Sequence, residues 1–552
     1  MKLKNILYSM MMGTAVLTGT TSCVSDLDQY PHTETTSKDV YTSLANYEAV
    51  LGKIYAAMVT SGQGKGGDNK DMESVLNNGS GFDYMRMFIN MQECGTDEFA
   101  STWLTGEQTT GLTYLSWDAN DAWVSDMYYR IYYNIALCNE FLRNANSASF
   151  SGADAEKMKE YKAEVRFMRA LFYFHALDLY RNIPMVTEND PVGSFIPPRY
   201  TPQQTFDYIE SELKDCVGDM LPASTCPYGQ ASQGAAYTLL AKLYLNSEVY
   251  TGVAKYAECK DACKKVMDMG YSLESDYSKL FNADNDKRTN EIIFALPVSA
   301  EHTVSWGSST YLVCGQLSMS NANQNVADFG ATSGWSEFRL RPEFVDKFTQ
   351  TDIDGGGDKR CKFFTNGQSK DVTSMTDETT GYLSEKWSNL KDDGTTASNT
   401  ADAGVETDYP LFRLADVYLM YAECVARLSE DWDNWDGGSD AEAATRKEGA
   451  IYYINKVRER AYGDAEHNVW KDNFASDADF LQFILDERAR ELYHEGYRRT
   501  DLIRFGEFTT NKYIWQWKGG THDGQAVDSK YNIYPIPNTE LTANPNLHND
   551  NY

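Results

Sequence analysis

The clearest pattern of hydrophobic and polar positions lies in the stretch YKAEVRFMRALFYFHALDLYRNIP, residues 161–184. Apolar residues recur there at steps of four and three, which places them on one face of an α-helix. They are Tyr161, Val165, Met168, Phe172, Ala176 and Leu179. Glu164, Arg166 and Arg169 fall on the remaining surface, and Pro184 ends the helix. Because the stripe is wide and aromatic, this helix needs partners on more than one side, as in an array of helical hairpins.

The same period recurs along the chain and predicts an α-dominated fold. Helices are predicted at 41–58, 122–146, 201–216, 232–245, 254–269, 409–428, 444–461 and 477–495. Thr201 is the expected N-cap of its helix, with Pro202 at the first helical position. The pair 232–245 and 254–269 alternates small and large residues as tetratricopeptide repeats do. One buried strand is predicted at 290–297.

Polar stretches separate these helices. Residues 82–117 mix aromatic and polar side chains without a clean period, which is typical of binding loops. Residues 350–408 are rich in Asp, Thr, Ser and Gly and are expected to form surface loops. The glycine-rich segment 61–71 has no P-loop pattern. No boundary divides the chain into independent domains.

The N-terminal residues predict export and lipidation. Residues 1–22 combine Lys2 and Lys4 with a short apolar region, as a signal peptide does. Cys23 follows small residues and is the expected lipidation site, although the leucine usual three positions earlier is absent. An ordinary secreted protein is the alternative. Residues 23–43 are expected to form an extended tether, with a single domain spanning 23–552. No later apolar run is long enough to cross a bilayer.

Composition narrows the function. The formal net charge of −30 argues against nucleic acid as a partner, because phosphate binding needs a basic face. Aromatic residues make up 13%, including 37 Tyr and 11 Trp, and exposed aromatic rings commonly grip sugars. Nine cysteines besides Cys23 show no zinc spacing, so we expect mostly free, buried thiols with room for one or two disulfides.

Acidic residues repeat every four positions near the C-terminus. Glu487, Glu491 and Glu495 lie on one face of the predicted helix 477–495. A pair of glycosidase carboxylates is one interpretation. A buried salt-bridge network is favoured, because the nearby arginines would lower the carboxyl pKa values and make a poor general acid. These nearby residues are Arg488, Arg498, Arg499 and Arg504.

Metal and cofactor signals are weak. The seven histidines, including His175 and His494, are scattered, and no HExxH pattern occurs. Asp284 and Asp286 are weak candidates for a structural calcium site, but turn formation explains them better. We therefore expect no cofactor.

Loop tryptophans give a better site signal. Trp103, Trp306 and Trp335 lie in the polar surroundings STWLTG, VSWGSS and TSGWSE. The axial C–H face of a sugar packs on an aromatic ring, while its hydroxyls need amides and charged groups. The alternative for each tryptophan is that its ring anchors the loop in the hydrophobic core.

Several separated blocks resemble one protein family. The stretch AEVRFMRALFYFHALDLYRNIPMV resembles the signature helix of the RagB/SusD family, the surface glycan-binding lipoproteins of Bacteroidota. The likeness recurs in order at PLFRLADVYLMYAEC, INKVRERA, ERARELYHEGYRRTDLIRFG and YPIPNTEL. The segments SSTYLVCG, SGWS and FTTNKYIWQWKGG are similar to a starch-binding member of the family.

This resemblance implies a SusD-like, all-α-dominated domain in which tetratricopeptide-like hairpins form a scaffold and long loops carry the glycan site. It implies no enzymatic activity, a lipid anchor on the outer face of the outer membrane, and delivery of starch or maltooligosaccharides to a SusC-like TonB-dependent transporter. Three alternatives remain: another glycan such as a fructan, a glycoside hydrolase using Glu487 and Glu491, and a lid that is mainly structural.

The resemblance also implies site residues. Trp103, Trp306 and Trp335 match an arc of aromatic residues that follows the curve of an α-glucan, and Arg86 matches an arginine that bonds sugar hydroxyls. The family's asparagine three residues after the first tryptophan is replaced by Gly106. We expect the last two predicted glycan-binding residues, Glu107 and Gln108, to supply the missing hydrogen bonds.

Overall fold

The computed structural model describes residues 37–64, 70–73, 75–76, 82–193, 195–399, 404–430 and 449–552. The predicted signal peptide, Cys23 and most of the tether lie outside these ranges. Within the tether range, α2 (Ser37–Val40) is helical where extended chain was expected. The chain divides into two compact units, Met1–Ala49 and Val50–Tyr552. The boundary falls within α3 (Leu44–Ala56), and everything below concerns the second unit.

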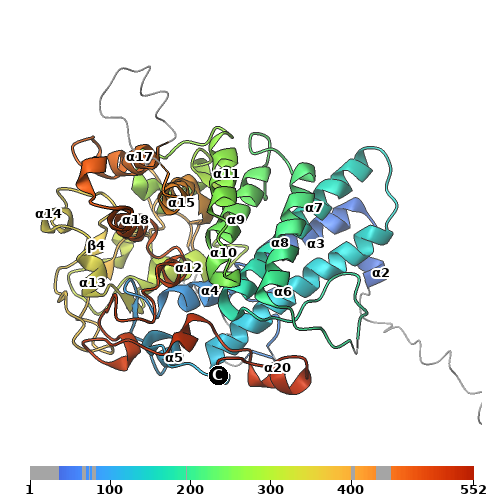
Figure 1. Cartoon of the computed structure of the whole chain (residues 1–552), viewed down its shortest axis with the longest axis horizontal. Helices are drawn as coiled ribbons and strands as arrows, with labels where there is room; N and C mark the ends of the chain where they lie inside the picture. Colours follow the sequence, from blue (N-terminus) through green and yellow to red (C-terminus); the bar gives the residue numbers. More distant parts are fainter. Residues whose placement is uncertain are drawn as a thin grey trace, which may run out of the picture. The chain divides into compact units, whose positions relative to one another are not determined.

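Helices dominate the second unit, as predicted (Figure 1). The longer ones are α4 (Tyr84–Glu93), α6 (Ala122–Ser147), α7 (Ala153–Tyr180), α8 (Pro202–Cys216), α9 (Gln233–Leu245), α11 (Tyr256–Met267), α12 (Ser308–Gly315), α15 (Leu414–Arg427), α17 (Ala450–Tyr462), α18 (Asp477–Leu492) and α19 (Arg498–Arg504). The short ones are α5 (Thr110–Tyr114), α10 (Ser247–Thr251), α13 (Pro342–Val345), α14 (Gln350–Ile353) and α20 (Asn538–Ala543). The 3₁₀ turns are η2 (Val217–Asp219), η3 (Tyr277–Phe281), η4 (Asn285–Lys287), η5 (Val326–Phe329), η6 (Lys471–Asn473), η7 (Lys518–Gly520) and η8 (Ser529–Asn532).

The long helices pack against one another in a series. The helix α7 contacts both α6 and α8, and α9 contacts α11. Next, α11 contacts α15, and α15 contacts α17 and α18. In Figure 1 the green helices α9 and α11 stand between α7 and α8 on one side and α15 and α18 on the other. The predicted array of helical hairpins is confirmed.

The central helix α7 is more enclosed than its sequence pattern suggests. All six residues of the predicted apolar stripe are buried, as expected. Glu164 and Arg169, which were expected on the surface, are also only 2% exposed. Glu164 accepts a hydrogen bond from the Tyr55 hydroxyl at 2.7 Å, and Arg169 pairs with Glu212 at 2.7 Å. These polar side chains are buried because partners from other segments satisfy them.

Local capping chemistry sets several helix starts. Thr201 caps α8 and Pro202 occupies its first helical position, as predicted, and Gln204 completes a capping box with Thr201. Ser232 caps α9 and Asp121 caps α6 through hydrogen bonds to backbone N–H groups. Each cap satisfies donors that have no partner inside the helix.

Three two-stranded antiparallel sheets link distant segments. They pair β1 (Ala100–Ser101) with β3 (Phe338–Arg339), β2 (Ile292–Leu296) with β6 (Tyr409–Arg413), and β4 (Phe363–Phe364) with β5 (Leu383–Ser384). The strand predicted at 290–297 is confirmed by β2. The helix predicted from 409 begins only at Leu414, because Tyr409 to Arg413 pair with β2 instead.

Two stretches expected to be loops contribute to the core. Residues 82–117 contain α4, all ten residues of which are buried. Residues 350–408 include Arg360 and Trp387, both 0% exposed. The polar composition of these two stretches therefore did not place them at the surface, because their side chains are buried against other parts of the protein.

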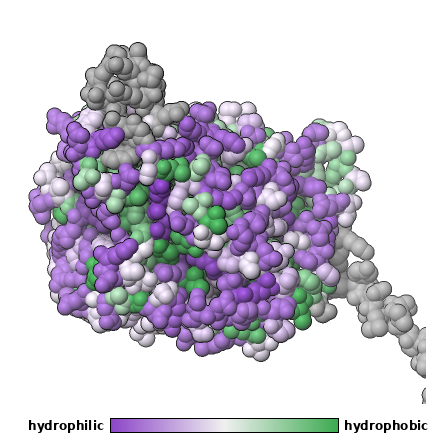
Figure 2. All heavy atoms as spheres, viewed as in Figure 1, coloured by the Kyte–Doolittle hydropathy of each residue, from purple (hydrophilic) through white to green (hydrophobic). Residues whose placement is uncertain are grey.

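Within the described residues, no helix has both the length and the apolar character that a membrane span requires. Hydrophilic residues cover most of the face shown in Figure 2, and hydrophobic residues gather only in small separate patches.

Candidate functional site

The β1–β3 ladder brings two of the predicted tryptophans together. Ser101 pairs with Phe338, and beyond this pair the Thr102 N–H donates to the Glu337 carbonyl oxygen at 2.7 Å. Trp103 and Trp335 therefore leave the same end of the ladder from opposite strands. The Trp103 side chain is 38% exposed, and Trp335 is half-buried.

Trp306 joins Trp335 through the short helix α12. The ring centroids of Trp306 and Trp335 lie 6.0 Å apart with an interplanar angle of 49°. Trp306 lies two residues before the start of α12. The Trp335 N–H donates to the carbonyl oxygen of Cys314, near the end of α12, at 2.8 Å. Both rings are half-buried, so each is held by the protein while part of its surface stays accessible. Three sequence-predicted aromatic residues thus come from linked segments.

A small cavity opens beside these two rings. Its volume is about 140 Å³, and its lining combines apolar and hydrogen-bonding groups. The lining residues are Trp306, Thr310, Cys314, Ala331, Thr332, Ser333, Trp335, Asn399, Gly404 and Val405. Aromatic faces beside hydroxyl and amide groups are what a sugar ring requires.

Arg86, on α4, connects all three tryptophan-bearing segments. Its Nη1 donates to the Trp306 carbonyl oxygen at 2.7 Å. Its Nη2 donates to Glu107 at 2.5 Å and to Glu337 at 2.9 Å. Glu107 belongs to the loop that follows Trp103, and Glu337 lies two residues after Trp335. We call Arg86, Glu107 and Glu337 the Arg86 cluster.

The burial of Arg86 changes its expected role. The resemblance implied a direct bond from its guanidinium to sugar hydroxyls. In the structure Arg86 is only 2% exposed, and both Nη atoms already donate to protein oxygens. Arg86 therefore joins the segments that carry the aromatic rings, while its bond to sugar hydroxyls stays a prediction.

The Arg86 cluster holds two carboxyl groups but only one positively charged group. Burial disfavours the charge on Arg86, but Glu337 and Glu107 outweigh burial and hold its pKa above the ordinary value. Burial raises the pKa of Glu337 well above its usual range, against the opposing effect of Arg86, and Glu107 adds to the rise. One cation shared between two buried carboxyl groups explains this direction.

Asp83 fixes the Trp306 segment from the other side. It caps α4 by accepting from the Arg86 N–H at 2.9 Å, and it also accepts from the Ser305 hydroxyl at 2.6 Å and the Ser308 N–H at 3.1 Å. A Cβ on Gly307 would lie 2.3 Å from its carboxylate, so the close approach requires glycine. Sequence reasoning missed both Asp83 and Glu337. Asp83 carried a detectable signal, since an Asp before a helical run is a typical N-cap.

Glu107 and Gln108 differ in accessibility. Glu107 is 8% exposed, since its side chain bonds Arg86 and its carbonyl oxygen accepts from Trp123 Nε1 at 2.7 Å. Gln108 is exposed, in a left-handed backbone conformation with φ 58°. Of these two side chains, only that of Gln108 is exposed, on the loop that follows Trp103.

The calcium candidates form a turn. Asp284 pairs with Lys287 at 2.8 Å and accepts from the Asp392 N–H at 2.9 Å, while Asp286 is exposed. Over the described ranges, no three His, Cys, Asp or Glu side chains are grouped to hold a metal ion. The nine cysteines after Cys23 are all free thiols, and seven of them are buried.

The three repeated glutamates form a salt-bridge network, as favoured from the sequence; Glu487 and Glu491 lie on α18, which ends at Leu492, and Glu495 lies just beyond it. Glu487 and Glu491 are fully buried, and Glu495 is 3% exposed. We call these three and their partners the α18 cluster. The partners are Arg360, Arg413, Arg458, Arg460, Arg490 and Lys386. Burial would raise the pKa of Glu491, but Arg460, Arg413 and Arg360 outweigh burial and lower it to about 2. A general acid needs a raised pKa and access to substrate, and this cluster provides neither.

The arginines named from the sequence have other partners. Arg488 and Arg504 pair with Asp501, Arg498 with Asp97, and Arg499 with Asp178. The network itself was predicted correctly, but most of its cations come from distant segments.

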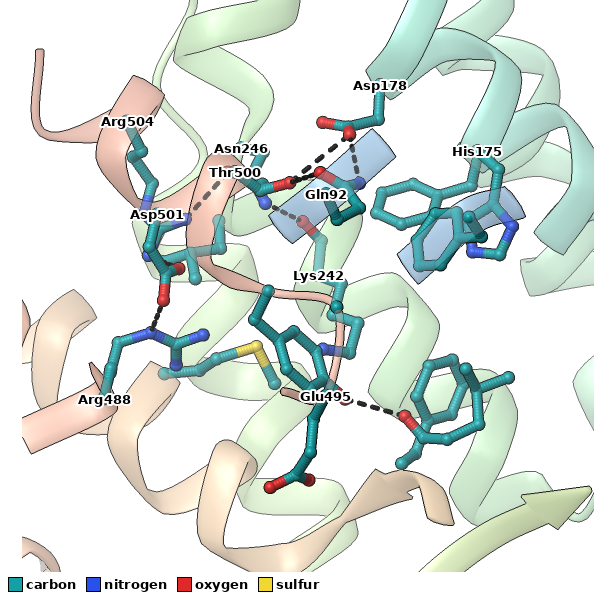
Figure 3. A pocket seen from close by; sticks show the side chains of 18 residues that line it. Gln92, His175, Asp178, Lys242, Asn246, Arg488, Glu495, Thr500, Asp501 and Arg504 are labelled. Carbon is teal, nitrogen blue, oxygen red and sulfur yellow. Dashed lines mark hydrogen bonds and ion pairs between the residues drawn. The ribbon is translucent and has the colours of Figure 1, made fainter. Parts of the chain in front are cut away.

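A second cavity lies inside the helical scaffold, and Figure 3 shows it. Its volume is about 50 Å³ and its walls include His175, Lys242 and Glu495. The polar groups around it bond one another: Arg488 donates to Asp501 at 2.8 Å and Gln92 to Asp178 at 2.9 Å. Burial lowers the pKa of His175 to about 3, which keeps this ring neutral. None of the predicted site residues lines this cavity, so we regard it as part of the scaffold.

Comparisons with known proteins agree with this architecture. Residues 362–552 match the family model described as SusD family, and residues 27–245 match one described as "Starch-binding associating with outer membrane". The chain is 32% identical to the starch-binding protein SusD of Bacteroides thetaiotaomicron, over 99% of both chains. It is 26% identical to a SusD-like protein of Formosa agariphila, over 78% of both chains.

Solved structures show the same fold. A SusD-like carbohydrate-binding protein of Bacteroides fragilis superposes with a TM-score of 0.70 at 19% identity, covering 92% of this chain and 100% of that one. A SusD superfamily protein of Parabacteroides distasonis gives 0.68 at 22% identity, covering 94% and 100%. Given the likeness along its whole length, the chain belongs to the SusD family.

Proposed function

We propose that this protein binds starch and maltooligosaccharides at the cell surface without cleaving them, and delivers them to a partner SusC-like TonB-dependent transporter. The observation that carries the proposal is the convergence of Trp103, Trp306 and Trp335 on segments that the Arg86 cluster joins. The starch-binding relative at 32% identity supports the α-glucan as ligand. The family description that names association with the outer membrane supports the location, with Cys23 as the lipid anchor.

In this proposal the rings of Trp306 and Trp335 stack on adjacent glucose units. Their centroids are 6.0 Å apart and tilted by 49°, so the two faces present a curved rather than a flat surface. A helical α-glucan is curved, whereas cellulose fragments are straight. Trp103 extends the surface across the ladder, and the Gln108 amide lies on its loop to bond hydroxyls. Preorganised rings bind with less loss of conformational freedom.

Calorimetric titration of the purified protein tests the ligand class. We expect heat with maltoheptaose and a cyclic α-glucan and none with cellohexaose. Trp335→Ala should weaken binding by about 1–3 kcal/mol, as for other aromatic anchors. Trp470→Ala is the control, because Trp470 is an exposed tryptophan in a different region of the chain.

The other outcomes separate the alternatives. Heat with levan but not with α-glucans would replace the proposed ligand with a fructan. Release of reducing sugar from amylopectin would indicate a glycoside hydrolase. The absence of binding heat with all these glycans would favour a protein that acts mainly as a structural lid.

A further inference from the structure

A second group of aromatic side chains lies beside the candidate site. The ring centroids of Tyr114 and Trp517 are 6.1 Å apart with an interplanar angle of 30°, so the rings are stacked. His522 meets Trp517 edge-on, with centroids 5.7 Å apart. Tyr114 and Trp517 are half-buried, and the His522 side chain is 40% exposed. We call these three residues the Trp517 platform.

The backbone holds Trp517 in a conformation that bulky residues rarely adopt. Its φ of 66° lies in the left-handed region, where a side chain other than glycine is strained. Its Nε1 donates to the Val372 carbonyl oxygen at 2.7 Å, which fixes the ring. The next residue, Lys518, is fully buried and donates to the carbonyl oxygens of Thr510 at 2.7 Å and Tyr513 at 2.8 Å. The loop is thus rigid, and an observed strain of this kind suggests a functional position.

A small hydrophobic cluster connects the platform to the site. Ala100, Leu104, Val372 and Met375 pack together, and Tyr114 and Trp517 pack against them. Ala100 belongs to β1, and Leu104 directly follows Trp103. The Thr110 hydroxyl also donates to the Leu104 carbonyl oxygen at 2.9 Å. The platform therefore shares its underlying core with the Trp103 loop.

Polar groups surround the platform as they do at sugar sites. Asp371 lies 3.6 Å from His522 Nε2 and also accepts a hydrogen bond from Gln516. Asp523 lies 2.8 Å from His522 Nδ1. Carboxylate and imidazole groups at the edge of a partly exposed ring can bond hydroxyls while the ring packs on C–H groups.

We propose that the Trp517 platform is a second glycan-binding surface, which contacts the outer part of α-glucan chains too long for the site at Trp306 and Trp335 alone. The inference rests on the proposed function, because it takes the same ligand class. It gives the protein a preference for polymer over short oligosaccharide that the first site does not provide.

Chain length separates the two surfaces experimentally. The affinity of Trp517→Ala for amylose should fall about threefold to tenfold, the range expected for one peripheral aromatic contact. Its affinity for maltoheptaose should equal that of the unaltered protein. Trp470→Ala should change neither affinity, and Trp335→Ala should weaken both. Equal amylose affinity for Trp517→Ala and the unaltered protein would overturn the platform while leaving the proposed function intact.

A measurement on the unaltered protein covers the case in which Trp517→Ala fails to fold. The chain has seven histidines, so the imidazole proton signals can be assigned with His522→Gln. Amylose should shift the His522 signal, and maltoheptaose should not. An unchanged signal at saturating amylose would overturn the platform. Failure of the unaltered protein to bind any α-glucan would overturn the proposed function itself.

Discussion

The α18 cluster and the Arg86 cluster both pair buried arginines with glutamates, and they are balanced in opposite ways. In the α18 cluster each carboxylate meets at least two cations; Glu491, for example, contacts Arg360, Arg413 and Arg460. In the Arg86 cluster a single guanidinium serves both Glu107 and Glu337. The pKa of Glu491 is consequently lowered to about 2, whereas burial raises that of Glu337.

We interpret the α18 cluster as part of the scaffold and the Arg86 cluster as the support of the proposed site. The surrounding arginines keep Glu487 and Glu491 ionised and bonded, so these two residues fasten α18 to the segments that carry Arg360 and Arg413. The Arg86 cluster lies directly beneath accessible aromatic rings, and its single cation fixes three loops at once. The same pairing of residue types therefore stabilises the fold in one place and supports the proposed binding surface in the other.

The largest effect is expected from Glu491→Gln. This change removes one buried negative charge that Arg360, Arg413 and Arg460 share, so the free energy of unfolding should fall by about 3–5 kcal/mol. Chemical denaturation measures it. Glu160→Gln is the control: its pair with Lys157 is partly exposed, so the loss should stay below about 1 kcal/mol. Equal losses for both variants would contradict the role of the α18 cluster.

The pH dependence of stability should show the same contrast. A carboxyl group whose folded pKa is lowered adds stability above its ordinary pKa, and this stability is lost as pH falls through the folded value. For Glu491 the window runs from about pH 4.5 down to about 2, and the lost free energy is roughly 3 kcal/mol. Glu491→Gln should therefore lose stability less steeply in acid than the unaltered protein. If stability fell with pH equally steeply in the variant and the unaltered protein, the lowered pKa of Glu491 would be contradicted.

Arg86→Met should have a smaller effect on stability and a large one on binding. We expect a loss of about 2 kcal/mol, because one of the two carboxyl groups left behind can take up a proton. Affinity for maltoheptaose should fall at least about tenfold, since the Trp306 segment and the Glu107 loop lose their shared anchor. Adding Glu107→Gln and Glu337→Gln should restore stability but not affinity. Recovery of both would mean that Arg86 acts only through stability.

The smallest effect is expected from Glu337→Gln. It removes surplus negative charge and keeps an oxygen that accepts from Arg86, so the change at neutral pH should stay below about 1 kcal/mol. Because the folded pKa of Glu337 is raised, the unaltered protein loses stability as pH rises above about 4.5, and the variant should lose less. A loss near that of Glu491→Gln would remove the distinction between the clusters.

Local signals in the sequence were sufficient for much of the scaffold. The start of α8 follows from Thr201, Pro202 and Gln204, which act within four residues of one another. The stripe of α7 follows from its period. The start of α15 was wrong because Tyr409 to Arg413 pair with β2, a segment more than a hundred residues away. Pairing over such distances leaves no periodic trace in one sequence.

The aromatic residues of the candidate site could be chosen from the sequence, but the hydrogen bonds that hold their segments together could not. Loop tryptophans in polar surroundings can be read directly from the sequence. The enclosure of Arg86 depends on Glu107 and Glu337, which are 21 and 251 residues away. Only the folded chain shows that both Nη atoms of Arg86 donate to protein oxygens, and this enclosure is the reason that we propose a positioning role for Arg86.

A crystal structure with maltoheptaose bound tests this account most directly. It predicts glucose rings stacked on Trp306 and Trp335, with Arg86 still bonded to Glu337 and to the Trp306 carbonyl oxygen. A glycan bound away from these rings would contradict the site. A glycan on the rings with Arg86 turned outward to bond its hydroxyls would contradict the positioning role of the Arg86 cluster.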